Sequence, residues 1–176
     1  MKWLNILLLL FIGRAAMALS VGDLTPEVSA PWTGGSVAVK PSDFKGQWLV
    51  VYFYPKSFTP GCTAEACSLR DGYGEIQKEG AAILGVSPDS IDQQLEFKGK
   101  YKLPFELVSD KKKTWSKAFD VLAFGGLFAQ RKTFIINPEG RIAYIFEKAG
   151  TSGHDAEVLL ELKKLKLNST ALKSNL

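Results

Sequence analysis

The stretch WLVVYFY, residues 48–54, limits the fold more than any other part of this sequence. It is apolar, rich in β-branched and aromatic residues, and does not alternate with polar ones, which is typical of a strand buried on both faces of a sheet. Pro55 ends it, and a helix is expected to start near Pro60, because proline is tolerated in a first turn. AAILGVS at residues 81–87 predicts the next buried strand. A helix between two such strands is the βαβ unit of a parallel sheet.

The rest of the chain continues this alternation. Ser90 and Gln93 form a capping-box pattern that opens a helix over IDQQLEFKGKYK. The other expected elements are a hairpin around TGGS, a strand in FELVS, a helix in TWSKAFDV, a hairpin over RKTFIINPEGRIAYIFEKA, a closing amphipathic helix in HDAEVLLELKKLKL and a frayed tail, NSTALKSNL. A parallel start and an antiparallel ββα finish predict an α/β fold, a thioredoxin-like sandwich whose central mixed β-sheet is flanked by helices.

The first residues have the pattern of a targeting segment. Lys2 precedes the apolar run WLNILLLLFIG, and AMA at residues 16–18 offers small residues for cleavage, as in a secretory signal peptide. The run is short for a membrane span, and an uncleaved N-terminal anchor is the alternative because Arg14 interrupts the region before the cleavage site. We expect residues 1–18 to lie outside the folded domain, residues 19–176, and the protein to be exported to a bacterial periplasm.

Charge gives little indication of a macromolecular partner. The formal charge of +4 includes Lys2 and Arg14, so the chain without residues 1–18 carries +2. Lys111 to Lys113 are expected in a solvated turn, and aromatic residues do not alternate with basic ones as a single-strand-binding groove requires. We therefore expect no nucleic-acid partner.

The helix after Pro55 carries both cysteines of the chain, Cys62 and Cys67. A structural zinc site takes four ligands, and the only histidine, His154, is expected at the surface near the start of the last helix. We therefore expect no metal and no organic cofactor. Export would instead place the two cysteines in an oxidising compartment, where disulfides persist.

Helix geometry limits what the two cysteines can do. Residues five apart on one helix have Cα atoms about 8.6 Å apart, whereas a disulfide needs them within about 7 Å. Either the segment is permanently irregular and carries a small structural disulfide, or the helix opens each time the bond forms. A disulfide that closes so short a loop stabilises little, which favours a redox cycle. Cys62 lies in the first turn, where free N–H groups favour a thiolate, and Thr59 is placed to donate to it.

The segment VVYFYPKSFTPGCTAEACSLRD resembles the active-site segment of the peroxiredoxins, and within them the peroxiredoxin Q or bacterioferritin comigratory protein group. The pattern P-x-x-x-T-x-x-C is present as Pro55, Thr59 and Cys62, and the similarity continues through LGVSPDS, YKLPFELVSD and RKTFIINPEGRI. The resemblance implies that Cys62 is the peroxidatic cysteine, Cys67 the resolving cysteine and Arg131 the active-site arginine. It also implies that Thr59 binds the peroxide and that Pro55 shapes the pocket.

The resemblance further implies a substrate and a reductant. The substrates would be hydrogen peroxide and organic hydroperoxides, and a thioredoxin-like dithiol protein would reduce the intramolecular disulfide. No partner subunit is needed for such a cycle, so we expect a monomer, with a weak dimer as the alternative.

Three further features leave alternatives open. Glu65 follows the group's CTxEA pattern and either belongs to the site or is a carboxylate on the helix surface. Arg70 is expected to form a salt bridge on the helix, with a role as a catalytic group as the alternative. The apolar segment Val121–Gln130 is either a loop packed on the core, or an apolar lip that favours bulkier hydroperoxides or a second subunit.

Two other functions compete with a peroxidase. An exported thiol–disulfide exchange protein would use the same cysteines, although their spacing differs from C-x-x-C. A secreted binding protein of thioredoxin fold would hold them as a structural disulfide. Peroxide consumption that depends on Cys62 distinguishes the peroxidase from both.

Overall fold

The structure, a computed structural model, describes residues 19–126 and 128–174. A seven-stranded mixed sheet forms its centre, in the order β2-β1-β5-β4-β3-β8-β9. The three middle strands are parallel, and antiparallel pairs extend the sheet on both sides. The strands are β1 (Ala30–Trp32), β2 (Gly35–Val39), β3 (Trp48–Phe53), β4 (Ala81–Ser87), β5 (Glu106–Ser109), β8 (Lys132–Ile136) and β9 (Ile142–Phe146). The predicted α/β class and mixed sheet are confirmed.

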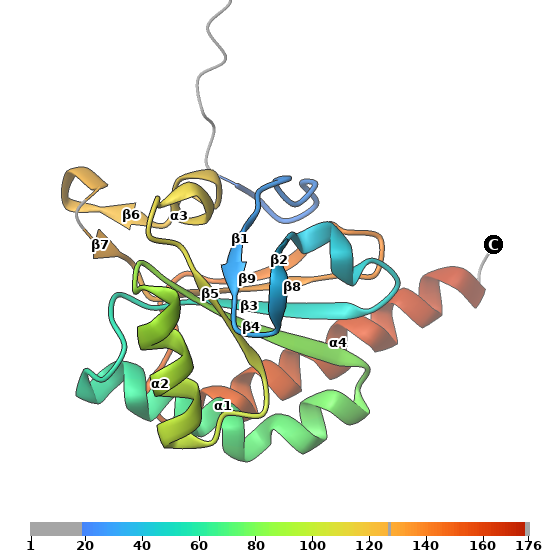
Figure 1. The fold of residues 1–176 in the computed structure, drawn as a ribbon. Coiled ribbons are helices and arrows are strands. Elements are labelled where there is room, and N and C mark those ends of the chain that lie inside the picture. Colours follow the sequence, from blue (N-terminus) through green and yellow to red (C-terminus); the bar gives the residue numbers. More distant parts are fainter. Residues whose placement is uncertain (1–18, 127, 175–176) are drawn as a thin grey trace, which may run out of the picture.

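The two faces of the sheet are covered differently (Figure 1). The long helices gather on one face, and short elements lie on the other. The long helices are α1 (Pro60–Lys78), α2 (Ile91–Tyr101) and α4 (His154–Ser174). The short elements are η1 (Pro41–Phe44), α3 (Thr114–Ala118), β6 (Leu122–Ala123), η2 (Phe124–Gly126) and β7 (Phe128–Ala129).

Strand β3 lies in the middle of this arrangement, and all of its residues are buried. Successive side chains of a strand point to opposite faces. Tyr52 therefore packs in the cluster under the long helices, together with residues of α1, whereas Phe53 packs on the other face against Phe119 of the α3 region. Burial on both faces explains why the sequence of β3 is apolar without alternation.

Most helices begin where the sequence predicts, although α3 ends at Ala118 instead of continuing through Val121. Helix α1 begins at Pro60, and the Ser90–Gln93 capping box opens α2 as predicted. The predicted frayed tail is wrong, because α4 continues through these residues to Ser174. No glycine or proline interrupts the tail, and Lys166 fastens this part of α4 to Glu79 at the end of α1, with Nζ 2.5 Å from Oε2.

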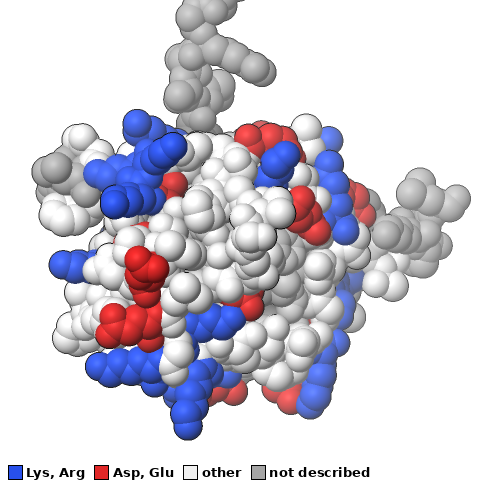
Figure 2. All heavy atoms as spheres, viewed as in Figure 1, with Lys and Arg blue, Asp and Glu red and all other residues white. Residues whose placement is uncertain are grey.

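Both signs of charge are interspersed on the face shown in Figure 2, between broad uncharged areas. Lys111 and Lys112 are exposed, as expected for a solvated turn. Among the helices that the structure describes, none is long and apolar enough to cross a membrane. The predicted targeting segment, residues 1–18, lies outside the described residues.

Candidate active site

The loop between β3 and α1 is held in place by a residue of the β4–α2 connection. Pro55 follows β3 and is half-buried, and the backbone N–H of Ser57 donates to Asp89 Oδ2 at 2.6 Å. Thr59 is the N-cap residue with extended backbone angles, and Pro60 occupies the first helical position. The unpaired N–H groups of the first turn are thus held at the end of β3, where they favour an anion.

Cys62 and Arg131 meet at this point although they are 69 positions apart in the chain. Cys62 lies in the first turn of α1 and is fully buried. Arg131 directly precedes β8, whose first residue, Lys132, is paired with Phe53 at the end of β3. This pairing brings the guanidinium over the helix start, where Nη2 donates to Cys62 Sγ at 3.4 Å. A fixed positive charge beside a sulfur at a helix N-terminus stabilises the thiolate.

Glu65 is the second partner of Arg131. Its carboxyl group is 0 % exposed and accepts a hydrogen bond at Oε2 from Nη1 of Arg131, so the alternative of a carboxylate on the helix surface is wrong. Burial raises the pKa of Glu65 to about 8, although the charge and hydrogen bond of Arg131 act to lower it. The sequence carried a signal for this arrangement, because Glu65 follows Cys62 by three residues and therefore lies on the same face of the helix.

Cys67 lies on the same helix as Cys62, and both are free thiols. Cys67 is half-buried and therefore more accessible than Cys62. The predicted salt bridge of Arg70 is confirmed, since its Nη2 lies 2.8 Å from Asp71 Oδ1. Arg70 also donates through Nη1 to the carbonyl of Tyr101 at 3.0 Å, which ties this part of α1 to the end of α2. Because α1 is a continuous helix, the two sulfurs cannot bond without local unwinding.

The hydroxyl of Thr59 is not directed at Cys62. It donates to the carbonyl of Lys56 at 3.0 Å and so closes the loop before α1. Gly61 provides the close approach that the site needs, because a Cβ atom there would lie 3.2 Å from Arg131 Nη2 and 3.5 Å from the methyl group of Thr151. The structure therefore brings Arg131 into direct contact with both Cys62 and Glu65, and it places Pro55 and Thr59 in the loop that leads into α1.

His154 is buried, so its expected surface position is wrong. The residue opens α4 where this helix packs against the sheet, and both ring nitrogens are engaged, with Thr133 Oγ1 at 2.8 Å and Glu157 Oε2 at 2.9 Å. Burial lowers the pKa of His154, although Glu157 acts to raise it. Neither nitrogen is left for a cysteine. Among the described residues, no group of three or more His, Cys, Asp or Glu side chains could hold a metal ion.

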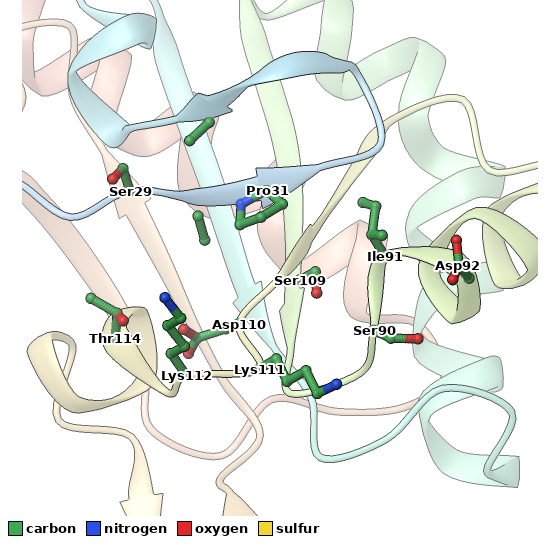
Figure 3. A pocket seen from close by; sticks show the side chains of 12 residues that line it. Ser29, Pro31, Ser90, Ile91, Asp92, Ser109, Asp110, Lys111, Lys112 and Thr114 are labelled. Carbon is green, nitrogen blue, oxygen red and sulfur yellow. The ribbon is translucent and has the colours of Figure 1, made fainter.

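A surface hollow of about 580 Å³ lies away from this cluster, beside β1 and the start of α2 (Figure 3). Pro31, Ile91, Ser109 and Lys112 are among the residues that line it. Neither cysteine and none of the residues around Cys62 contributes to its wall. The hollow is thus separate from the thiol site.

The small hairpin β6–β7 replaces the predicted apolar loop. Val121 and Ala129 are buried at its base, whereas the side chain of Phe128 is 58 % exposed. The hairpin is therefore partly packed on the core and partly presented to solvent. Its role as a lip or a contact surface stays a prediction.

Comparison with known proteins assigns the chain to a family. Residues 21–145 match the AhpC/TSA family. Peroxiredoxin Bcp of Bacillus subtilis is 39 % identical over 155 residues, which cover 85 % of this chain and 98 % of the relative. The chain therefore belongs to the AhpC/TSA family, the peroxiredoxins, and is a peroxidase.

Solved structures refine this placement. Peroxiredoxin Q of Xanthomonas campestris superposes with a TM-score of 0.75 at 37 % identity, covering 83 % of this chain and 96 % of the other. The bacterioferritin comigratory protein of the same organism, studied for alkyl peroxide reduction through trapped intermediate and ligand complexes, gives 0.75 at 36 % identity with the same coverage. The resemblance to the peroxiredoxin Q and Bcp group is thereby confirmed.

Proposed function

We propose that Cys62 is the peroxidatic cysteine of a hydroperoxide reductase. Its thiolate attacks the terminal oxygen of the hydroperoxide, the O–O bond breaks, and water or an alcohol leaves after taking up a proton, while Cys62 becomes a sulfenic acid. The observation that supports this role most directly is the hydrogen bond from Arg131 Nη2 to the buried Sγ. The same guanidinium would stabilise the charge that develops on the departing oxygen.

Thr59 and Pro55 serve the substrate rather than the sulfur in this proposal. Rotation of the Thr59 hydroxyl away from the Lys56 carbonyl would let it bind the peroxide, and Pro55 shapes the rim. Hydrogen peroxide and organic hydroperoxides are both substrates. The alkyl peroxide activity studied in the X. campestris protein and the exposed Phe128 of the β6–β7 hairpin favour the organic ones.

Cys67 is the resolving cysteine. After α1 unwinds locally, the Cys67 thiolate attacks the sulfur of the Cys62 sulfenic acid, a disulfide forms, and the hydroxyl group leaves as water with one proton. A thioredoxin-like dithiol protein then attacks this disulfide, so that its own two thiols are oxidised and both cysteines return as thiols. The complete cycle takes place within one chain, which acts as a monomer.

The cycle takes place outside the cytosol in this proposal. Lys2, the apolar run that follows it and the small residues at 16–18 support export to a periplasm. The dithiol reductant is then also an exported or membrane-tethered protein.

Mass spectrometry with one equivalent of hydrogen peroxide tests the cycle. The reduced protein is expected to lose both free thiols and about 2 Da, as disulfide formation requires. Cys67→Ser is expected to gain about 16 or about 32 Da instead, and Cys62→Ser to remain unchanged. Thiols of the native chain that survive the peroxide would refute the role of Cys62, and a disulfide-free oxidised product would refute that of Cys67.

A further inference from the structure

Tyr52 on β3 and Tyr54, directly after this strand, are both fully buried but differ in the bonding of their hydroxyl groups. They lie on the same face of the sheet, and their rings stack with centroids 5.4 Å apart. The hydroxyl of Tyr54 donates to Gln94 Oε1 at 2.5 Å and lies 3.3 Å from Ser57 Oγ. The hydroxyl of Tyr52 has no hydrogen-bond partner within the described part of the chain.

The Tyr52 hydroxyl is held in a closely packed place. A Cβ atom on Gly85 of β4 would lie only 2.6 Å from this oxygen, so the glycine is what makes room for it. Burial, first of all, raises the pKa of Tyr52 well above its ordinary value of 10.0, and the neighbouring titratable groups, Tyr54 before the others, raise it further. The phenol therefore stays protonated, as a donor without an acceptor, in the buried cluster that also contains Cys62 of α1.

Two further polar side-chain atoms, both on α1, also lack a hydrogen-bond partner within the described part of the chain. Thr63 Oγ1 and Glu65 Oε1, both in the first two turns of α1, are also buried without a partner. Together with the Tyr52 hydroxyl they are three of the four such side-chain atoms among the described residues. Phe58, just before the helix, has a φ of +65°, a conformation that costs energy for a bulky residue. The closed form of this segment is thus destabilised at several adjacent points.

The unmet polar atoms and the strained Phe58 all affect the equilibrium between closed and locally unwound α1. A buried polar group without a partner costs free energy that is recovered when water reaches it. Tyr52 packs in the same buried cluster as Cys62 and Leu69 of α1, so we expect unwinding of the first turns to admit water to its hydroxyl, and the same unwinding brings Cys67 within reach of Cys62. The helix would then open more often than a fully bonded helix does.

We propose that the Tyr52 hydroxyl, together with Thr63, is a positioning group for the resolving step, because its unmet hydrogen bond in closed α1 favours the unwound form in which the disulfide is made. This inference rests on the proposed roles of Cys62 and Cys67. It assigns to Tyr52 no contact with the peroxide, so the first oxidation of Cys62 is independent of it.

Tyr52→Phe and Tyr54→Phe form a matched pair for the test. Each substitution removes one buried hydroxyl from the same face of the sheet, but only the substitution of Tyr54 removes hydrogen bonds. Reduced protein is mixed with a small excess of hydrogen peroxide, quenched at intervals with a thiol-alkylating reagent, and analysed by intact mass for thiol, disulfide and sulfinic acid. Thr63→Val, which also removes an unmet hydroxyl, is the second test variant.

In Tyr52→Phe the disulfide is expected to form about fivefold or more slowly than in the native protein, since removal of one unmet bond stabilises closed α1 by at least that factor. The sulfinic product is expected to increase, because the sulfenic acid waits longer for Cys67 and meets a second peroxide. Cys62 oxidation is expected to keep its native rate. Thr63→Val is expected to change the same quantities in the same direction, and Tyr54→Phe to leave disulfide formation at least as fast as in the native protein.

Two results would overturn the inference: disulfide formation at the native rate in both Tyr52→Phe and Thr63→Val, or equal slowing in Tyr52→Phe and Tyr54→Phe. The same experiment on the native chain distinguishes a failure of this inference from a failure of the proposed function. If the native protein forms no disulfide, the assignment of Cys67 fails. If it forms one at the same rate as the Tyr52 and Thr63 variants, only the role of the two hydroxyls fails.

Discussion

Replacing Glu65 with Gln tests whether this carboxyl is buried in its neutral form beside Arg131. The amide has nearly the same shape and can still accept a hydrogen bond from Nη1, but it does not titrate. The substitution is best made in a protein in which Cys62 and Cys67 are both Ser. The thiols then neither oxidise nor titrate near pH 8, where thiols ordinarily do.

The pKa of Glu65 fixes the sign and size of the effect. It is about 8 in the folded protein, against an ordinary value of 4.5. Between these values the folded protein holds a proton that the unfolded chain has lost, so the stabilisation is complete at the acid end and is lost as the pH rises to about 8. From about pH 6.5 to about pH 8.5 the loss amounts to about 2 kcal/mol of unfolding free energy. Glu65→Gln is expected to lack this loss.

Urea denaturation across this range measures the difference. His154 interferes little, because its pKa is lowered from 6.5 by burial and it is neutral in both states above that pH. The parent protein is expected to lose about 2 kcal/mol relative to Glu65→Gln between the two pH values. Parallel curves for the two proteins would show that Glu65 is ionised in the folded state throughout, and would refute the reasoning from burial.

Two further substitutions test the neighbouring contacts. Arg131→Met is expected to lower the rate constant for oxidation of Cys62 by about a hundredfold or more, because it removes the donor that faces the sulfur and the departing oxygen. Stopped-flow mixing with peroxide measures this rate constant. A value within about threefold of the native one would contradict the prediction. His154→Ala is expected to cost about 2 to 4 kcal/mol in urea denaturation, since it leaves a cavity and an unpaired Thr133 hydroxyl. Unchanged stability would show that the buried imidazole contributes no net packing.

The sequence was sufficient for the features that depend on local pattern. The unbroken apolar run of β3, the proline at the first position of α1 and the capping box of α2 each have a local physical cause, and each element lies where the pattern predicted it. The peroxiredoxin pattern around Cys62 depends equally on a short segment. These features required no knowledge of the distant chain.

What the sequence did not show depends on contacts between distant segments. His154 looked like a surface residue because only the packing of α4 against Thr133 on β8 buries it. The tail stayed helical because Lys166 finds Glu79, 87 positions away. The unmet hydroxyl of Tyr52 likewise cannot be predicted from the sequence, because Tyr54, two residues further on, is the same residue type but finds a partner on α2.

The same arrangement serves reactivity and weakens the helix start. Gly61 leaves room beside the Arg131 guanidinium that reaches Cys62, and a glycine in the first turn contributes less to helix stability than a larger residue. Glu65 holds the arginine through one oxygen while the other stays without a partner. A helix start without these costs would be more stable, but it would hold Cys62 and Cys67 apart more firmly. In a cycle that requires unwinding, the low stability of α1 at its N-terminal end therefore contributes to the function of the site.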